Sequence, residues 1–305
     1  MKIVFMGTPE FAIPSLEVCH KKHQVVGVIS QPDRPRGRGK AVSFSPLKQR
    51  AVELGLDVYT FEKIGVEGVE LLRSLAPDIM VTAAYGQILT DEILSIAKYG
   101  IINVHGSILP SWRGSSPVQH SILAGDEESG VTIMQTARAV DSGDIIRISK
   151  TPILENEGTY SLLDRLAHIG AETLDVVLED INSGIATYTP QDHSKATFCK
   201  MLTKSDAIID WSNSAEQIVR KIRAFDYMGA STTLNGEMLK IYSATVVDEN
   251  GKIGEVIKAS DKTGVVVGCG EKSIKIGQML LAGGKRTNST DVVRGRKIKL
   301  GDNLG

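Results

Sequence analysis

Short β-rich runs alternate with helix-like stretches through residues 2–182 of the chain. The runs are KIVFM, QVVGVIS, DVYT, DIMVTAA, GIINVH and GVTIMQT, and the stretches between them, such as SPLKQRAVELGL, GVEGVELLRSL and TDEILSIAKYG, have apolar residues at helical spacing. This alternation is typical of βαβ units, in which helices cover both faces of a mainly parallel, buried sheet. We therefore predict an α/β fold whose ligands bind beyond the carboxyl ends of the strands.

A long helix and a linker separate this region from a second one. The segment TYSLLDRLAHIGAETLDVVLEDINSG has apolar residues near the helical period and ends in glycine, so we expect it to close a first domain at residues 1–187. Residues 188–206 lack a long apolar period, which indicates a linker. In residues 207–305, a helix that begins with a capping box at Ser214 and Gln217 precedes closely spaced strands, including GEVIKAS, GVVVGCG and SIKIGQMLL. These strands predict a small β-barrel.

The composition is that of an ordinary globular protein, with 42% hydrophobic and 23% charged residues among 305. The net charge of −1 hides an asymmetry, because residues 201–305 carry 16 Lys and Arg against 12 Asp and Glu. Cys19, Cys199 and Cys269 are far apart, which favours neither a zinc site nor a disulfide framework and indicates a reducing compartment. The N-terminal apolar run is too short for a signal peptide, and no run reaches the roughly 18 apolar residues of a membrane span, so we expect a cytoplasmic protein.

Two polar side chains stand side by side at the end of one predicted strand. If the run IINVH is extended, Asn103 and His105 share one face, and the apolar residues beside them share the other. Asp141 lies in a turn, DSGD, before the next strand and is within reach of a histidine on a neighbouring strand. An acyl-transfer site needs donors for a developing oxyanion, a group that manages a proton and a carboxylate that orients the histidine. This trio meets those needs, although a lone histidine is more often a satisfied polar side chain and Asp-Ser-Gly is an ordinary turn.

Other catalytic motifs find little support in the sequence. The first strand-to-helix turn, GTPEF, has one glycine where G-x-G-x-x-G needs three, and G-x-x-x-x-G-K-[ST] is absent from the sequence, which disfavours NAD and ATP binding. Ser107, Ser115 and Ser116 lie near His105, but the sequence has no G-x-S-x-G elbow, so a Ser-His-Asp hydrolase is also disfavoured.

Two segments are basic enough to contact phosphates. Residues 31–46, QPDRPRGRGKAVSFSP, carry a net charge of +3 among Gly and Pro, which predicts either a flexible cationic loop beside a site or a solvated loop. The C-terminal end is also basic, which indicates either a solvated surface or, on a barrel joined to an enzyme, a nucleic-acid contact. The cations are Arg34, Arg36, Arg38 and Lys40 in the first segment, and Lys285, Arg286, Arg294, Arg296, Lys297 and Lys299 in the second.

With these motifs assembled, the chain resembles the methionyl-tRNA formyltransferases, a branch of the folate-dependent formyltransferases. The resemblance runs nearly end to end, through MGTPEFAIPSL, QPDRPRGRGK, TAAYGQILT, INVHGSILPSWRGSSPVQ, GVTIMQ with DSGD, KIRAF and GDNL. It implies a Rossmann-like catalytic domain, a linker and an OB-like barrel that helps to bind tRNA. It also implies transfer of a formyl group from 10-formyltetrahydrofolate to the α-amino group of initiator methionyl-tRNA, without a metal. We further expect a monomer that binds no membrane.

The resemblance also implies roles for individual residues. The catalytic Asn, His and Asp of the family correspond to Asn103, His105 and Asp141. Its folate contacts correspond to Ser107, Ile108, Leu109 and Pro110, together with Tyr85, Gly86 and Gln87. Its tRNA contacts correspond to Arg34, Arg36, Arg38, Lys40, Arg220, Lys285, Arg286, Arg296 and Lys297. The chain departs from the family pattern at Gly106, at Ile108 and in the segment RAFDYMGA, which replaces the usual sequence after Phe225.

Rival functions share parts of this pattern. A glycinamide ribonucleotide formyltransferase has the same trio but no appended barrel, and a formyltetrahydrofolate hydrolase typically carries a regulatory domain before the catalytic one. An RNA-binding module with a decayed active site is opposed by the intact trio. An assay of formyl transfer to charged initiator tRNA separates these alternatives.

Overall fold

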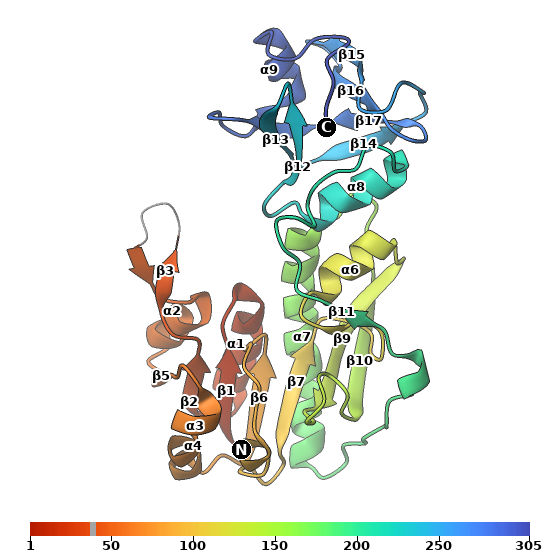
Figure 1. Cartoon of the computed structure of the whole chain (residues 1–305). Helices are drawn as coiled ribbons and strands as arrows, with labels where there is room; N and C mark the ends of the chain where they lie inside the picture. Colours follow the sequence, from red (N-terminus) through yellow and green to blue (C-terminus); the bar gives the residue numbers. More distant parts are fainter. Residues whose placement is uncertain (37–40) are drawn as a thin grey trace. The chain divides into compact units, whose positions relative to one another are not determined.

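The computed structural model of the chain describes residues 1–36 and 41–305, and these residues divide into two compact units. Unit 1 comprises Met1–Pro117, Glu128–Pro152 and Leu163–Cys199. Unit 2 comprises Val118–Glu127, Ile153–Leu162 and Lys200–Gly305. Figure 1 shows the elements of both units, coloured along the sequence.

A mainly parallel sheet forms the centre of unit 1, in the order β10-β9-β7-β6-β1-β2-β5. Its strands are β1 (Lys2–Gly7), β2 (Gln24–Ser30), β5 (Val58–Thr60), β6 (Ile79–Ala83), β7 (Ile101–His105), β9 (Glu128–Gln135) and β10 (Ile145–Pro152). The strands from β5 to β7 pair in parallel, which confirms the predicted α/β fold. The edge differs from that expectation, because β9 pairs with β7, and β10 with β9, in the antiparallel sense. A short turn joins β9 to β10, and a connection of that length makes a hairpin because a parallel crossover needs a dozen or so residues.

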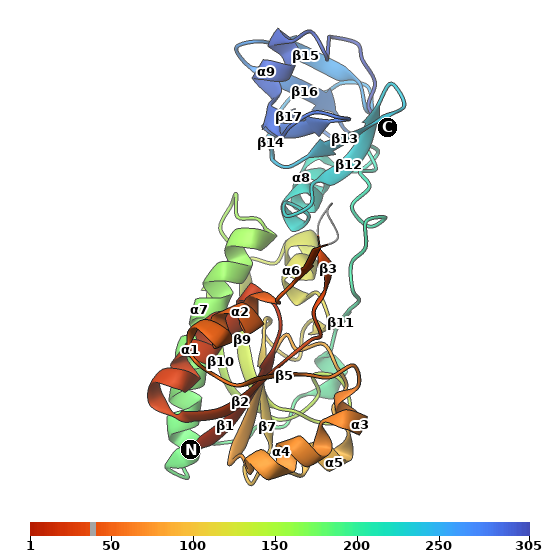
Figure 2. The same cartoon turned by 90° about the vertical axis from the view of Figure 1, so that its left-hand side faces the viewer.

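Helices cover both faces of this sheet (Figure 2). On one face lie α1 (Ile13–Lys22), α2 (Pro46–Glu53) and α7 (Thr159–Asn182), and on the other α3 (Ile64–Glu67), α4 (Val69–Leu75) and α5 (Asp91–Leu94). Because both faces are covered, β1 is a nearly continuous apolar run, and its Val4 and Met6 pack with residues of α3, α4 and α5. The segment GVEGVELLRSL forms α3 and α4 in place of one helix. The break falls at Gly68, where a Cβ would lie 2.7 Å from Cγ1 of Ile64.

The long helix predicted near the end of the first domain is present as α7. Its Leu166 is fully buried, and Gly184, with a φ of +72°, turns the chain shortly after its end. Further along, β11 (Phe198–Cys199) pairs in parallel with β8 (Arg113–Gly114), and the two form a separate two-stranded sheet. Residues 188–199, which belong to the predicted linker, thus pack within unit 1. The short elements are η1 (Glu10–Ala12), β3 (Arg34–Arg36), β4 (Ala41–Ser43), α6 (Pro117–Ala124) and η2 (His193–Lys195).

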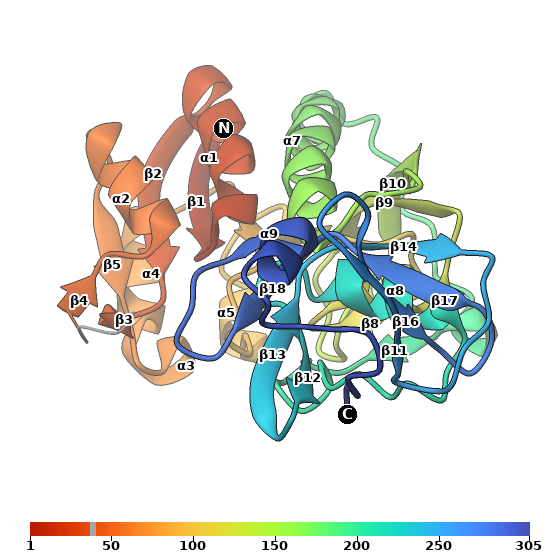
Figure 3. The same ribbon diagram turned by 90° about the horizontal axis from the view of Figure 1, so that it is seen from above.

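Unit 2 contains two four-stranded antiparallel sheets, and Figure 3 labels several of their strands. They run β12-β13-β18-β19 and β14-β17-β16-β15, and these antiparallel strands confirm the β-rich second domain predicted from the sequence. The elements are α8 (Ala215–Ala224), β12 (Ala230–Leu234), β13 (Glu237–Ile241), β14 (Ala244–Val247), β15 (Val256–Ser260), β16 (Gly264–Gly268), β17 (Ser273–Ile276), β18 (Gln278–Leu281), β19 (Thr287–Asn288) and α9 (Ser289–Arg294).

Helix α8 begins at the predicted capping box. The Ser214 hydroxyl accepts a hydrogen bond from the backbone N–H of Gln217, and the Gln217 side chain accepts one from the backbone N–H of Ser214. Ile218 and Ile222 then point into the core of unit 2. Within the described ranges, none of the helices combines the length and apolar character that a membrane crossing requires.

Candidate active site

Strand β7 carries two of the predicted catalytic side chains to the carboxyl edge of the sheet. Asn103 is partly exposed, and His105, the last residue of the strand, is 5% exposed. The two residues share one face because side chains alternate along a strand. Asp141 lies in the turn between β9 and β10, with Oδ1 3.5 Å from Nδ2 of Asn103 and Oδ2 3.6 Å from Nδ1 of His105. The structure therefore brings the predicted trio together.

The amide of Asn103 has a defined orientation. The hydroxyl of Thr82, on the neighbouring strand β6, donates a hydrogen bond to Oδ1 of Asn103 at 2.8 Å. This contact places the amide oxygen toward Thr82, so the Nδ2 group faces Asp141. Asn103 therefore presents N–H donors to the side of the site where the carboxylate lies.

Both ring nitrogens of His105 face oxygen atoms. Nε2 lies 3.1 Å from the carbonyl oxygen of Trp112, and Nδ1 faces the carboxylate of Asp141. A carbonyl oxygen only accepts, so Nε2 carries the proton of that hydrogen bond, and a proton on Nδ1 as well gives the charged ring. The same carbonyl oxygen accepts a hydrogen bond from the thiol of Cys199 at 3.4 Å. Burial raises the pKa of that thiol, which keeps it in the protonated, donating form.

Asp141 has a backbone φ of +47°, a left-handed conformation that residues with a Cβ rarely adopt. The backbone N–H of Gly114 donates to Oδ2 of Asp141 at 2.9 Å. The side chain of Gln191 donates to the backbone carbonyl oxygen of Asp141, and the guanidinium of Arg113 contacts Gln191 in turn. Gln191 and Arg113 were not among the predicted residues, because a polar side chain in an irregular segment is usually solvated. Here both are buried.

The turn predicted to contact folate follows β7 directly. Thr132 on β9 holds it, because the Thr132 hydroxyl donates to the carbonyl oxygen of Ser107 at 2.7 Å and accepts from the N–H of Leu109 at 3.1 Å. Ser107 and Leu109 are buried, whereas Ile108 and Pro110 are partly exposed. The turn therefore presents apolar surface at the edge of the sheet where β7 ends.

The other predicted folate contacts follow β6. Tyr85 is 4% exposed, and its hydroxyl has no hydrogen-bonding partner among the described residues. Burial raises the pKa of this hydroxyl, so it stays a donor. Gly86 has a φ of +85°, which suits glycine. The side chain of Gln87 makes internal hydrogen bonds. It donates to the carbonyl oxygen of Phe61 and accepts from the N–H of Ile64.

The predicted basic loop of unit 1 is only partly within the described residues. Arg34 is exposed, and its Nη2 lies 2.9 Å from Oε2 of Glu62. Arg36 is on β3, which pairs with β4. Arg38 and Lys40 lie outside the described residues.

Unit 2 holds the other predicted cations. The exposed ones are Lys285, Arg286, Arg296 and Lys297. The guanidinium of Arg286 lies 4.3 Å from the centre of the Tyr242 ring, a cation–π contact. Arg220, on α8, is partly buried and donates to the carbonyl oxygen of Ala124 at 3.4 Å.

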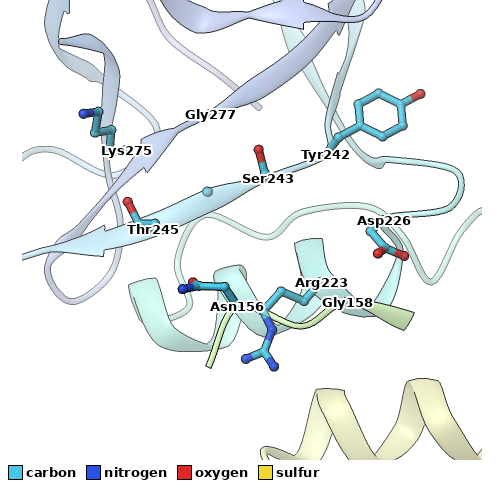
Figure 4. Close-up of a pocket in the computed structure, with 10 residues that line it drawn as sticks. Asn156, Gly158, Arg223, Asp226, Tyr242, Ser243, Thr245, Lys275 and Gly277 are labelled. Carbon is cyan, nitrogen blue, oxygen red and sulfur yellow. The ribbon is translucent and has the colours of Figure 1, made fainter. Parts of the chain in front are cut away.

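A pocket of about 410 Å³ lies within unit 2 and includes none of the predicted site residues (Figure 4). Figure 4 shows Asn156 near β14, which carries Thr245, whereas the guanidinium of Arg223 points away from that strand and donates to the carbonyl oxygens of Glu157 and Leu154. Asp226, from the segment that departs from the family pattern, also lines this pocket, and burial raises the pKa of its carboxyl. Across the residues for which positions are given, no three His, Cys, Asp or Glu side chains gather in a way that would hold a metal ion.

An amide, an imidazole and a carboxylate that meet at the carboxyl edge of a mainly parallel sheet define a class, the group-transfer enzymes of the acyl-transfer type. Residues 1–178 match the formyl transferase family, and residues 201–297 match the C-terminal domain of formyl transferases. The chain belongs to the formyl transferase family.

Relatives and solved structures extend this comparison. A methionyl-tRNA formyltransferase from Sulfurihydrogenibium sp. is 41% identical over 99% of this chain and 99% of its own length. The structure of an N-formyltransferase from Helicobacter canadensis, in complex with folinic acid and dTDP-3-aminofucose, is 20% identical with a TM-score of 0.69 and covers 92% of this chain and 100% of that one. HypX from Aquifex aeolicus, in complex with tetrahydrofolic acid, is 19% identical with a TM-score of 0.64 over 96% of this chain, which spans 47% of HypX. These two structures share the fold.

Proposed function

We propose that this protein transfers a formyl group from 10-formyltetrahydrofolate to the free α-amino group of initiator methionyl-tRNA. The observation that carries the proposal is the meeting of Asn103, His105 and Asp141 at the carboxyl edge of the sheet. The relative named a methionyl-tRNA formyltransferase, which is 41% identical over nearly its whole length, supports the choice of acceptor.

Asn103 and His105 are the proposed donors to the formyl oxygen. Negative charge grows on that oxygen as the amine nitrogen bonds to the formyl carbon, and each donor held ready for it typically contributes on the order of a hundredfold to a thousandfold in rate. The contacts of Asp141 at 3.5 Å with Asn103 and 3.6 Å with His105 are at or beyond the limit of a hydrogen bond. Both side chains therefore keep an N–H to offer the substrate, while Trp112 anchors the other ring nitrogen of His105.

Asp141 has two proposed roles. Its charge balances a protonated His105 ring and keeps that ring oriented toward the substrate. The amine loses a proton when the new bond forms, and the folate nitrogen gains one when the old bond breaks. Asp141 is the member of the trio that can accept the first proton, through water, and return it to the departing nitrogen.

The loops after β6 and β7 contain groups that fit a folate. Ile108 and Pro110 offer partly exposed apolar surface for a pterin ring. Tyr85, Gly86 and Gln87 stay proposed contacts through the loop after β6, although the Tyr85 hydroxyl is itself buried in the core with Ile64 and Leu72. These residues would bind the formyl donor beside Asn103 and His105.

Cations of unit 2 and of the basic loop are the proposed contacts to tRNA. Lys285, Arg296 and Lys297 are exposed and form no ion pair within the described part of the chain. A cation of this kind is available to bind a phosphate without first giving up a protein partner. The proposal extends to Arg34, Arg36, Arg38, Lys40, Arg220 and Arg286.

An acceptor assay tests the function. Purified protein is given 10-formyltetrahydrofolate with methionyl-tRNA, with glycinamide ribonucleotide, with a dTDP-amino sugar, or with no acceptor, and the formylated product or free formate is measured. We expect product with methionyl-tRNA. Product with another acceptor alone, or formate alone, would replace the proposal with the corresponding activity.

Two variants test the site itself. Asn103→Ala and His105→Ala each remove one donor, so we expect turnover to fall about a hundredfold to a thousandfold. Far-ultraviolet circular dichroism should remain that of the wild type, because neither side chain belongs to the apolar core. Near wild-type turnover in either variant contradicts the assignment of that residue.

A further inference from the structure

The turn that carries Asp141 is held by a buried side chain from a distant part of the chain. Nε2 of Gln191 donates to the backbone carbonyl oxygens of Asp141 at 3.0 Å and of Gly143 at 2.7 Å. Asp141 has its φ of +47° in this turn. This conformation is unfavourable for residues with a Cβ, although less so for Asp than for most, and surrounding contacts stabilise it. The two hydrogen bonds from Gln191 are contacts of that kind.

Arg113 determines which end of the Gln191 amide faces the turn. Nε and Nη2 of Arg113 lie 3.1 Å and 2.6 Å from Oε1 of Gln191. A guanidinium has donors and no acceptor, so the amide oxygen faces Arg113 and the amide N–H groups face the turn. Arg113 is 4% exposed and Gln191 is 6% exposed, so neither side chain can replace its partner with water freely. Gln191 is therefore a fixed donor.

The segment around Arg113 also contacts the proposed catalytic side chains. The carbonyl oxygen of Trp112 accepts from His105, and the N–H of Gly114 donates to the Asp141 carboxylate. Residue 114 has to be glycine in this arrangement, because its φ is +121° and a Cβ there would lie 2.1 Å from the carbonyl oxygen of Cys199. The segment thus fixes the ring and the carboxylate through its backbone, and the Asp141 turn through the Arg113 side chain.

We propose that Gln191, oriented by Arg113, is a positioning residue that aims the carboxylate of Asp141 at Asn103 and His105. This inference rests on the catalytic role proposed above for Asp141. A displacement of about 1 Å in a catalytic group costs on the order of a hundredfold in rate. If the hydrogen bonds from Gln191 are lost, the turn can shift, and the Asp141 carboxylate then moves away from Asn103 and His105.

Gln191→Glu tests the inference without leaving Arg113 unpaired. Glutamate keeps the length of the side chain and its contact with Arg113, but a carboxylate cannot donate to the two carbonyl oxygens of the turn. We expect kcat for formyl transfer to fall about 10-fold to 100-fold. We expect the KM values for both substrates to stay within about threefold of the wild type, because the change acts on the chemical step. Equilibrium binding of the formyl donor should be unchanged.

Two further variants provide the comparison. Gln191→Ala removes the same hydrogen bonds with no new charge, and we expect a loss of kcat in the same range. Gln49→Ala removes an exposed glutamine on α2, and its kcat should equal that of the wild type. Activity is expressed per active site, counted by titration with the bound formyl donor, so that partly unfolded protein does not lower kcat.

A double variant separates positioning from a general structural role. If Gln191 acts through Asp141, Gln191→Glu costs no further activity when Asp141 is already Asn, so the losses are not additive. Full kcat per active site in both Gln191 variants, or additive losses in the double variant, overturns the inference. Wild-type protein that fails to formylate methionyl-tRNA refutes the proposed function instead, so the two failures are distinguishable.

Discussion

Thr82 and Arg113 each fix the orientation of an amide side chain near the candidate site. The Thr82 hydroxyl donates to Oδ1 of Asn103, and the Arg113 guanidinium donates to Oε1 of Gln191. An amide has an acceptor end and a donor end, so a donor beside one end decides what the other end presents. In both cases the N–H groups face Asp141, in one case its carboxylate and in the other its backbone.

Thr82→Val tests whether the orientation of Asn103 matters for the reaction. Valine has nearly the same shape but removes the hydroxyl, so the Asn103 amide becomes free to turn its oxygen toward the site. One hydrogen bond is worth about 1 kcal/mol, and we expect kcat to fall by about fivefold, less than in Asn103→Ala. Thr82→Ser restores the hydroxyl and should restore most of the rate. Steady-state kinetics with methionyl-tRNA measure both, and equal activity in the Val and wild-type proteins would show that Thr82 has no such role.

Some residues of the candidate site could be predicted from the sequence pattern, and others could not, because they lie in different kinds of segment. Asn103 and His105 are visible because strand alternation places them on one face, and Asp141 because a turn follows its neighbouring strand. Gln191 lies in a segment without periodicity, and only the folded chain shows that this segment returns to β8. The approach of Gln191 to Asp141 depends on tertiary packing, which no local spacing encodes.

The same contrast applies to whole elements. Helix α7 has a long apolar period, and α8 has a capping box, so local signals sufficed to predict both. Helix α5 is shorter than the predicted stretch, and Ser95, just after its end, turns its hydroxyl back to the carbonyl oxygen of Glu92. The break between α3 and α4 falls at Gly68, which also packs too closely against Ile64 to carry a Cβ. Such endings depend on one or two contacts, which is why they were not predicted.

Asp226, which follows α8, is partly buried, and this setting makes its carboxylate form less favourable. Its carboxylate accepts a hydrogen bond from the backbone N–H of Tyr160 in the first turn of α7. Burial nevertheless raises the pKa of Asp226, so the folded protein favours the protonated form more than the unfolded chain does. The stability that comes from this group is therefore complete below the ordinary Asp pKa, about 3.9, and is lost as the pH rises through the folded-state value.

Asp226→Asn should remove this pH dependence. Asparagine stays neutral and can still accept from Tyr160, so we expect the variant to melt about 2 °C above the wild type at pH 7 and at the same temperature as the wild type below pH 4. Thermal unfolding followed by circular dichroism across this pH range measures the difference. A melting temperature at pH 7 equal to or below that of the wild type would contradict the prediction.

Asp210→Asn is the matched control in the same unit. The Ser212 hydroxyl and N–H donate to the Asp210 carboxylate and lower its pKa. Its contribution to stability is present above the ordinary Asp pKa and lost as the pH falls. Asp210→Asn should therefore lower the melting temperature at pH 7 and have little effect at low pH, opposite in sign to Asp226→Asn.

At the scale of the whole molecule, the positive charge is concentrated in the last third of the sequence. Residues 201–305 have four more Lys and Arg than Asp and Glu, although the net charge of the whole chain is −1. An acidic first part repels a polyanion at long range, so productive contact with tRNA depends on local cations. Lys285 and Lys297 are exposed and have no ion pair among the residues described.

The double variant Lys285→Ala with Lys297→Ala tests these two cations by the response of tRNA binding to salt. If both side chains bind phosphates, their loss reduces the slope of log K against log salt concentration by about 2 and weakens tRNA binding most at low salt. The control pair is Lys21→Ala with Lys98→Ala, which removes the same charge just before β2 and β7, at the amino edge of the sheet and so opposite to the candidate site. Filter binding from about 50 to 200 mM salt measures both slopes. Binding of the formyl donor should be the same in both variants, because neither pair touches the trio. If both pairs reduce the slope of log K against log salt concentration equally, then total charge, and not Lys285 and Lys297, governs the association with tRNA.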